Sequence, residues 1–340
     1  MIKMRPMKRK ASIAILVLTI GFSYSCAEKK EEEKASPKGV TFKTETLKRI
    51  GLRGDNWCLT WAKDGSQVVS MDDGMWLPLE KPIEQIHNKL YWVIGDSDSF
   101  VREDIPNYPD FSGKMGSWFG YGMGSVEGNL YSAISKTPDS SWSGPFLGIK
   151  LLKSTDNGES WHRVNKAGKE LALGVVDSMR NVVNEDEMFF LKEFGMPHKE
   201  QLAYPFSFVD FVQNGQDNSA AKDEFVYIYA PEGAQAHKLT LARTPKNKIE
   251  IRDEWEYFTA FDQENKPQWS KDITKRGYVH EFPQKSNKGH YFGWYSWLPS
   301  VVWNEGLGLY IMVNGGSYGG YGMTNSDEDY YHRWMHTETG

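Results

Sequence analysis

Residues 154–161 read Ser-Thr-Asp-Asn-Gly-Glu-Ser-Trp, and they predict a tight turn between two strands. The carboxylate of Asp156 can accept hydrogen bonds from the backbone of its own turn. Gly158 can take the positive φ angle that such a turn requires. Trp161 offers a large apolar side chain to pack on the neighbouring strands. Because short runs with strand character flank this turn on both sides, the stretch predicts a β-hairpin.

The same arrangement recurs along the chain from about Gly39 onward. Short apolar or alternating runs are separated by Asn, Asp and Gly, a spacing typical of a sandwich, a barrel or a propeller. The predicted strands are 58–62, 67–71, 90–94, 121–126, 130–134, 148–153, 161–164, 225–230, 238–242, 301–303 and 309–313. Helical signals are few: 171–184 is the best helix candidate, and 246–255 is expected to hold one turn. The chain is therefore predicted to be all-β.

The turn at 154–161 also resembles the Asp-box, whose pattern is Ser-x-Asp-x-Gly-x-Ser/Thr-Trp. In sialidases and similar proteins this box lies on the outer turn of a propeller blade. The resemblance therefore implies a β-propeller with a structural role for Asp156 and Trp161, and we assign neither residue a catalytic role.

The first predicted hairpin carries the residues with the clearest chemical potential. Its turn is centred near Asp64, with Asp55 nine residues before it and Asp73 nine residues after it. Both carboxylates are therefore predicted at the same end of neighbouring strands, which lie about 4.8 Å apart. Two carboxylates at one site can supply the acid and the base or nucleophile that hydrolysis of a glycosidic bond needs. The alternative is that Asp55 caps a turn and Asp73-Gly74 ends a strand, because Asp is common in turns.

The stretch Gly-Asp-Asn-Trp-Cys-Leu-Thr-Trp-Ala-Lys-Asp-Gly at 54–65 resembles the opening of the family labelled domain of unknown function 4185. Further similar segments follow in order at 117–131, 154–162, 225–233, 239–249, 254–270 and 300–313. The resemblance implies a five-bladed β-propeller. Some relatives are endo-D-arabinanases with an aspartate pair in the first blade. The resemblance therefore implies a glycoside hydrolase in which Asp55 and Asp73 are the catalytic pair.

Three features depart from the family pattern. Cys58 stands where relatives often have Pro. Asp72 doubles the acid before Gly74, so that Asp72 and Asp73 could exchange roles. Neighbouring residues of a strand face opposite sides of the sheet, so only one of these two side chains should reach the central channel of the propeller. The chain ends at His-Thr-Glu-Thr-Gly where relatives continue with strand sequence, and the closing blade is expected to be incomplete at the C-terminus.

Several aromatic and polar residues are candidates for contacts with a sugar. The predicted substrate-binding residues are Asn56, Trp57, Arg243, Tyr295 and Trp297. An aromatic ring such as Trp57 could stack on a sugar, and Arg243 could hold a carboxylate or sulfate through paired hydrogen bonds. The structural alternatives are a blade core for the aromatic residues and a buried ion pair between blades for Arg243.

Two other functions stay open at this point. A polysaccharide lyase would use a His or Tyr base, for which His280, His290 and Tyr291 are candidates near Tyr295. A glycan-binding protein without catalysis would need only the aromatic contacts. No Cys or His group has zinc spacing, and the Gly-rich stretch 315–322 lacks the Lys-Ser/Thr of a phosphate loop. We therefore predict neither a metal nor a cofactor.

The N-terminal residues predict export. Basic residues in positions 3–10 precede an apolar stretch at 11–22, which fits a secretory signal and is shorter than the about 20 residues of a membrane span. Ser-Tyr-Ser before Cys26 resembles a lipoprotein cleavage site, although the usual Leu three places before the Cys is absent. Cys26 is therefore the predicted lipidation site, and an ordinary signal peptide cut elsewhere is the alternative.

The resulting organisation is a signal peptide at 1–26, a charged flexible tether at 27–38 and a propeller domain at 39–340. The predicted partners are a polysaccharide substrate and a membrane reached through the lipid on Cys26. The predicted location is the outer membrane or cell surface, with the periplasm as the alternative. A net charge of −5 argues against a nucleic-acid partner, which requires clustered Lys and Arg.

Overall fold

A computed structural model describes residues 37–47, 54–72, 86–109, 111–112, 118–137, 146–173, 185–193, 204–232, 238–281 and 299–313. Contacts divide the chain into two units, Met1–Val40 and Thr41–Gly340, and the strands all belong to the second unit. None of the helices in the described ranges has the length and hydropathy to span a membrane. The predicted signal peptide and Cys26 lie outside those ranges.

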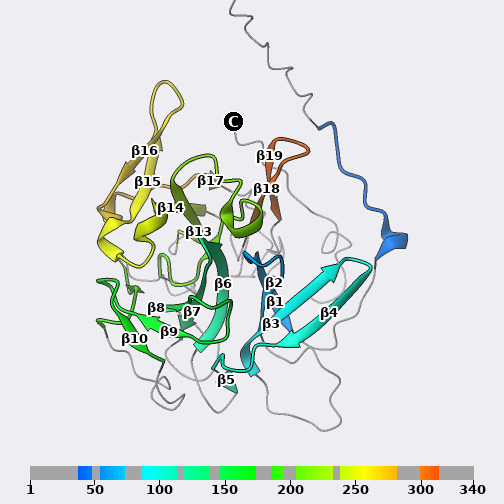
Figure 1. The fold of residues 1–340 in the computed structure, drawn as a ribbon. Coiled ribbons are helices and arrows are strands. Elements are labelled where there is room, and N and C mark those ends of the chain that lie inside the picture. Colours follow the sequence, from blue (N-terminus) through cyan, green and yellow to red (C-terminus); the bar gives the residue numbers. More distant parts are fainter. Residues whose placement is uncertain are drawn as a thin grey trace, which may run out of the picture. The chain divides into compact units, whose positions relative to one another are not determined.

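The described part of the chain is all-β, as its turn spacing predicts, and successive strands of each sheet pair antiparallel (Figure 1). The first sheet has the order β1-β2-β3-β4, with β5 beside β3: β1 (Asp55–Trp61), β2 (Gln67–Asp72), β3 (Ile86–Asp96), β4 (Ser99–Asp104) and β5 (Phe111–Ser112). The second has the order β6 to β10, with β11 beside β8: β6 (Trp118–Val126), β7 (Asn129–Lys136), β8 (Gly148–Ser154), β9 (His162–Val164), β10 (Glu170–Ala172) and β11 (Phe190–Leu191).

The third sheet runs from β12 to β16, with β17 beside β14: β12 (Asp210–Phe211), β13 (Phe225–Pro231), β14 (Lys238–Pro245), β15 (Glu256–Phe261), β16 (Pro267–Ser270) and β17 (His280–Glu281). A fourth, two-stranded sheet is the hairpin of β18 (Ser300–Asn304) and β19 (Leu309–Val313). The helices of the described residues are short 3₁₀ turns: η1 (Thr44–Thr46), η2 (Gln216–Asn218), η3 (Lys246–Lys248), η4 (Arg252–Glu254) and η5 (Ile273–Lys275).

Every strand predicted from the sequence is present, and η3 and η4 supply helical turns where the 246–255 stretch predicts one. The helix expected to begin at Leu171 is wrong at its start. Residues Glu170–Ala172 form β10, because their backbone pairs with β9 in the register Glu170↔Val164. The ladder of hydrogen bonds with a neighbouring strand outweighs the weak local preference for helix.

Apolar side chains fill the spaces between successive sheets. One buried cluster joins residues of the first and second sheets, including Val68, Leu90 and Met123. A second cluster joins the second and third sheets, including Leu151 and Ile228. The strand β6 is buried along its whole length because it takes part in both interfaces.

Gly122 lets β6 approach β12 closely. Its φ is +70°, and the pairing of β6 with β7 shifts by one residue between Tyr121 and Met123, which marks a bulge. A Cβ atom at Gly122 would overlap the carbonyl oxygen of Val209, so only glycine fits this contact. The close approach brings residues of the first three sheets together around Cys58.

Candidate functional site

The first hairpin brings two acidic residues together at its open end. Its turn is closed by Ala62 N–H donating to the Ser66 carbonyl (2.8 Å), and Asp64 Oδ1 accepts from the Ser66 N–H (2.9 Å). From there the strands run antiparallel, and the register sets Asp55 opposite Asp72. Asp55 and Asp72 therefore share one end of adjacent strands. Asp73 lies outside the described residues.

A β-bulge changes which acid faces Asp55. The pair Cys58↔Ser70 would place Asp55 opposite residue 73 if the ladder continued regularly, but the register shifts by one residue between Asp55 and Cys58. Asn56 takes up this shift with a φ of +49°. Bulges are frequent next to active sites, where they redirect a side chain. The two residues of this bulge, Asn56 and Trp57, are both predicted substrate contacts, and Trp57 is 38% exposed.

Asp72 lies in a buried environment shared with a thiol and a phenol. Its exposure is 1%. Burial raises the pKa of Cys58 well above its ordinary value, and the charges of Asp210 and Asp72 raise it further. Burial likewise raises the pKa of Tyr108, and Asp72 adds to this effect although a hydrogen bond with Ser132 opposes it. Asp72 and Asp210 are thus both neighbours of Cys58, although they come from different sheets.

Asp210 is the group in this cluster whose protonation is most altered. It begins β12, and its Oδ1 accepts a hydrogen bond from the Phe211 N–H at 2.9 Å. Burial raises its pKa to about 8, although hydrogen bonds from the backbone of Phe211 and Met123 act in the opposite direction. Its carboxyl group is therefore protonated at neutral pH. A carboxylic acid held neutral by burial can act as a proton donor, and such groups mark candidate catalytic sites.

We call Asp55, Asp72 and Asp210 the acid cluster. Its members come from β1, β2 and β12, so the fold gathers them from two different sheets. A protonated acid beside other carboxylates is the arrangement that general acid–base chemistry uses. Asp210 can therefore hold a proton at neutral pH, and the register of β1 and β2 sets the other two acidic residues opposite each other in a neighbouring sheet.

The other predicted substrate-binding residues either lie outside the described residues or are engaged within the fold. Tyr295 and Trp297, and with them His290 and Tyr291, lie outside the described residues. Arg243 on β14 is bound within its own sheet: its Nε donates to Glu256 Oε2 at 2.9 Å.

The ion pair of Arg243 joins two strands of one sheet, whereas the alternative considered from the sequence placed it between blades. Its guanidinium also stacks over the rings of Phe225 and Trp269, at 4.1 Å from each centroid. Because its guanidinium already contacts one carboxylate and two rings, Arg243 helps to hold those rings in place.

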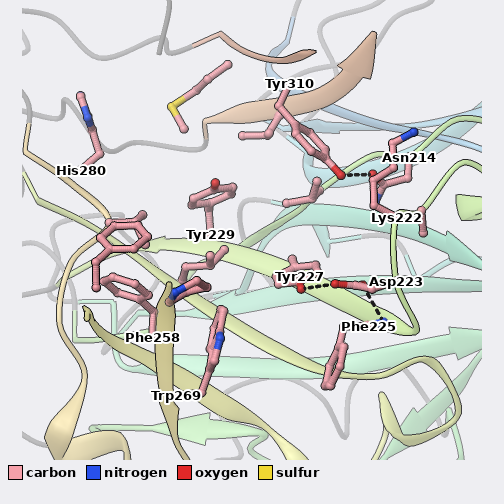
Figure 2. A pocket seen from close by; sticks show the side chains of 18 of the residues that line it. Asn214, Lys222, Asp223, Phe225, Tyr227, Tyr229, Phe258, Trp269, His280 and Tyr310 are labelled. Atoms are coloured by element: carbon pink, nitrogen blue, oxygen red, sulfur yellow. Dashed lines mark hydrogen bonds between the residues drawn. The ribbon is translucent and has the colours of Figure 1, made fainter. Parts of the chain in front are cut away.

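A cavity of about 540 Å³ lies against the third sheet and the β18–β19 hairpin (Figure 2). Aromatic side chains form much of its wall. The rings come from the four strands β13, β15, β16 and β19: Phe225, Tyr227, Tyr229, Phe258, Phe261, Trp269 and Tyr310. Polar groups stand among them, namely Asn214, Lys222, Asp223, Asn265 and His280.

The alternation of β13 explains why its rings face the cavity. Val226, Ile228 and Ala230 are buried in the cluster between the second and third sheets. The residues between them, Phe225, Tyr227 and Tyr229, are half-buried and project from the opposite face. One strand therefore supplies core residues on one side and an aromatic wall on the other.

Hydrogen bonds hold two of the rings in place. The Tyr227 hydroxyl donates to Asp223 Oδ2 at 2.6 Å, and the Tyr310 hydroxyl donates to Asn214 Oδ1 at 2.8 Å, as Figure 2 shows. Burial lowers the pKa of His280, so this wall residue is neutral at pH 7. The cavity is thus an aromatic site with a few fixed polar groups, the usual composition of a small-molecule site.

Sequence reasoning missed Asp210 and the cavity. Asp210 had a signal, since it is a single acid within the apolar run Phe208 to Val212. The aromatic positions of β13 were visible in the alternation at 225–230. The opposite wall of the cavity comes from β18 and β19, which lie about 70 residues further along the chain than β13.

A scan against models of protein families finds no match to this chain. A search of curated proteins also finds no match. Among solved structures, the chain is similar to the crystal structure of "a putative hydrolase from Bacteroides ovatus", with 12% identity and a TM-score of 0.39. The match covers 77% of this chain and 63% of that one, so the chain spans less than two thirds of its length. A similarity of this level supports neither a fold nor a function, and the family resemblance stays a prediction.

Proposed function

We propose that the protein is a glycoside hydrolase that acts on an extracellular polysaccharide, with Asp55 and Asp73 as its catalytic pair. The observation that carries the proposal is the register of β1 and β2, which sets Asp55 opposite the first member of the Asp72-Asp73 doublet. A pair of carboxylates is what hydrolysis of a glycosidic bond requires, one as acid and one as base or nucleophile. The buried proton on Asp210 lies within the same cluster and supports this use.

We further propose that the sheets are blades of a five-bladed propeller. Three sheets follow chain order from their first strand outward. Their first strands also contact one another in sequence, β1 with β6, β6 with β12 and β12 with β18. A radial arrangement of four-stranded blades produces this pattern, because the first strand of each blade lines a common axis. In this arrangement the acid cluster lies at one end of the axis.

The substrate class follows from the family resemblance at 54–65 and from the predicted export signal. A furanose polymer such as an arabinan is the substrate that the resemblance favours. We propose that the mature protein is held at the outer membrane or cell surface by lipid on Cys26, where a polysaccharide would be within reach.

The test is release of reducing ends from a panel of polysaccharides that includes arabinan. We expect the purified protein to cleave at least one member. Asp55→Asn and Asp73→Asn should each lower kcat by about a hundredfold or more, since each removes a group that transfers a proton or attacks the sugar. Asp72→Asn is measured beside them, because only one member of the doublet can share a face with Asp55. Asp253→Asn in η4 is the matched control, and it should leave kcat unchanged.

Three results would contradict the hydrolase. Full activity of Asp55→Asn would remove the acid pair from the mechanism. Binding without product, lost in Trp57→Ala and kept in Asp55→Asn, would indicate a glycan-binding protein. A product that absorbs ultraviolet light through a new double bond would indicate a lyase.

A further inference from the structure

The third sheet and the β18–β19 hairpin enclose a cavity between them. Large clusters of buried residues fill the contacts between the first three sheets. The cluster against the hairpin has only four buried members among the described residues: Val212, Leu239, Val301 and Met312. The remaining volume is the cavity of about 540 Å³. That size lies within the range of about 300–1,000 Å³ that is typical of small-ligand sites.

Tyr229 is a polar residue of this cavity wall whose hydroxyl has no hydrogen-bond partner among the described residues. Its hydroxyl forms no hydrogen bond with any described residue, whereas those of Tyr227 and Tyr310 are both engaged. Figure 2 shows the Tyr229 ring to the left of these two tyrosines, with its hydroxyl pointing away from the strand that carries it. Burial raises the pKa of Tyr229 to about 12, so the hydroxyl keeps its proton at any physiological pH. An unused donor amid aromatic rings is suited to a ligand that is partly apolar and partly hydroxylated.

The charges around the cavity exclude a cation as its ligand. An aromatic cage for a quaternary ammonium group needs ring faces that are open to the ligand. Here the guanidinium of Arg243 already lies over Phe225 and Trp269. Lys222 and Asp223 are the charged residues of the wall, since His280 is neutral, and their charges cancel. An uncharged ligand is therefore favoured.

We propose that this cavity is a sugar-binding subsite that holds an uncharged ring of the polysaccharide, with the Tyr229 hydroxyl as its hydrogen-bond donor. A sugar ring has apolar faces formed by its C–H groups and hydroxyls around its edge. The C–H faces can pack against the aromatic wall. The hydroxyls can form hydrogen bonds with Tyr229 and with the polar groups beside it. The choice of a polysaccharide as the source of this ring rests on the proposed function.

The subsite lies on the same strand as one member of the acid cluster. Val212 lines the cavity, and Asp210 lies two residues before it in an extended segment. Residues two apart in a strand project from the same face and are about 6.8 Å apart along it. The cavity wall and Asp210 are thus close to each other along the chain.

The experiment measures binding separately from cleavage. The full chain carrying Asp55→Asn is titrated with neutral oligosaccharides from arabinan, xylan and glucan, with an oligogalacturonate and with tetramethylammonium chloride. Tryptophan fluorescence is the readout, because Trp269 lines the cavity. We expect at least one neutral oligosaccharide to bind. Adding Tyr229→Phe should weaken this binding about three- to tenfold, the worth of one hydrogen bond, without a change in Tm.

Two further variants control for unrelated effects. Tyr278→Phe removes the hydroxyl of a tyrosine that is 43% exposed and does not line the cavity, and it should leave the affinity unchanged. Phe261→Ala removes a ring that lines the cavity and is 48% exposed, so the fold should tolerate the change while binding weakens. The pair distinguishes the cavity from any other aromatic surface.

The proposal would be overturned if no neutral oligosaccharide bound, or if Tyr229→Phe and Phe261→Ala both kept the affinity of the parent. Preferential binding of the oligogalacturonate or of tetramethylammonium would overturn the ligand class. Binding that depends on Tyr229 in a protein without hydrolytic activity would support the subsite and contradict only the hydrolase.

Discussion

A carboxyl group that keeps its proton at neutral pH is unusual, and Asp210 owes this property to its surroundings. It is 4% exposed and begins β12, which contacts β6 of the second sheet. Burial away from water disfavours the charged carboxylate and raises the pKa. Hydrogen bonds from two backbone amides favour the charged form, but their effect is smaller. The same burial that suits Asp210 to proton donation also links its protonation to the stability of the fold.

The stability of the protein should therefore fall as the pH rises from about 4 to about 8. Between the ordinary pKa of 3.8 and the native value of about 8, the folded protein binds a proton at Asp210 that the unfolded chain has released. Raising the pH therefore favours unfolding, by at most about 1.4 kcal/mol per pH unit. Asp210→Asn keeps an acceptor for the Phe211 N–H and carries no charge. We expect it to be more stable than the parent at pH 8.5, by about 1 kcal/mol or more, and similar at pH 5.

Urea unfolding of both proteins at the two pH values measures this difference. Comparing the two proteins cancels the contribution to stability of every group that titrates in both. Asp253→Asn controls for the loss of an exposed acid. If Asp210→Asn were no more stable than the parent at pH 8.5, the pKa of the carboxyl would not be raised in the native protein.

Local elements are where sequence reasoning succeeds, and the turn between β8 and β9 shows why. All its predicted features are present. Asp156 Oδ1 accepts from the Ser160 N–H at 2.9 Å, Gly158 has a φ of +97°, and Trp161 is buried. The turn also reaches the first sheet, since the Asn157 side chain donates to Asp64 Oδ2 at 2.7 Å. Such turns depend on a few adjacent residues, so their chemistry can be predicted from the sequence.

Asp156→Ala should destabilise the protein by about 1–3 kcal/mol, because it removes several hydrogen bonds beneath a buried tryptophan. Besides the Ser160 N–H, Asp156 accepts from the Ser160 and Ser154 hydroxyls at 2.6 and 2.7 Å. Chemical denaturation measures the loss. The activity of the folded fraction should be unchanged, in line with the structural role predicted for this turn.

Asp262→Ala is the matched control. Asp262 holds the turn between β15 and β16 in a similar way, accepting from the Glu264 and Lys266 N–H groups, but it lies at an exposed hairpin end. Asp262→Ala should therefore destabilise the protein less than Asp156→Ala does. Equal losses in the two variants would show that the first turn contributes only its own hydrogen bonds and does not support Trp161.

The hairpin β1–β2 marks the limit of prediction at this scale. Its turn and strands follow from local residues, but the bulge at Asn56 does not, because Asn is common in regular turns and strand ends as well. That single bulge pairs Asp55 with Asp72, whereas a regular ladder would pair it with residue 73. The sequence could therefore predict that acids gather at this strand end and could not predict their register.

At the scale of the whole molecule, the contacts that form the sites join residues far apart in the chain. Cys58, Asp72 and Asp210 meet because Gly122 lets β6 approach β12, and nothing in the neighbouring sequence of each residue indicates this. The aromatic cavity likewise depends on a hairpin from the end of the described chain. Fold class could be predicted from repeated local signals, whereas the packing between sheets could not.

The location of the protein is predicted to depend on Cys26. We predict that Cys26→Ala releases the protein from the membrane fraction of cells that export it. Each buried CH₂ of an attached acyl chain contributes about 0.8 kcal/mol to membrane binding, and two chains are enough for stable anchoring. Without lipid, the charged stretch after residue 26 offers no apolar surface to hold the protein there. Detergent phase partition and the mass of the mature N-terminus measure the result.

Cys58→Ala is the control for this prediction, because Cys58 is the only other cysteine of the chain and is a buried free thiol. Replacing it should cost some stability through lost packing and leave the protein in the membrane fraction. Retention of Cys26→Ala in the detergent phase would contradict the lipid anchor. In that case an ordinary signal peptide would be the better interpretation of residues 1–26, and the polysaccharide would have to meet a protein that is free in its compartment.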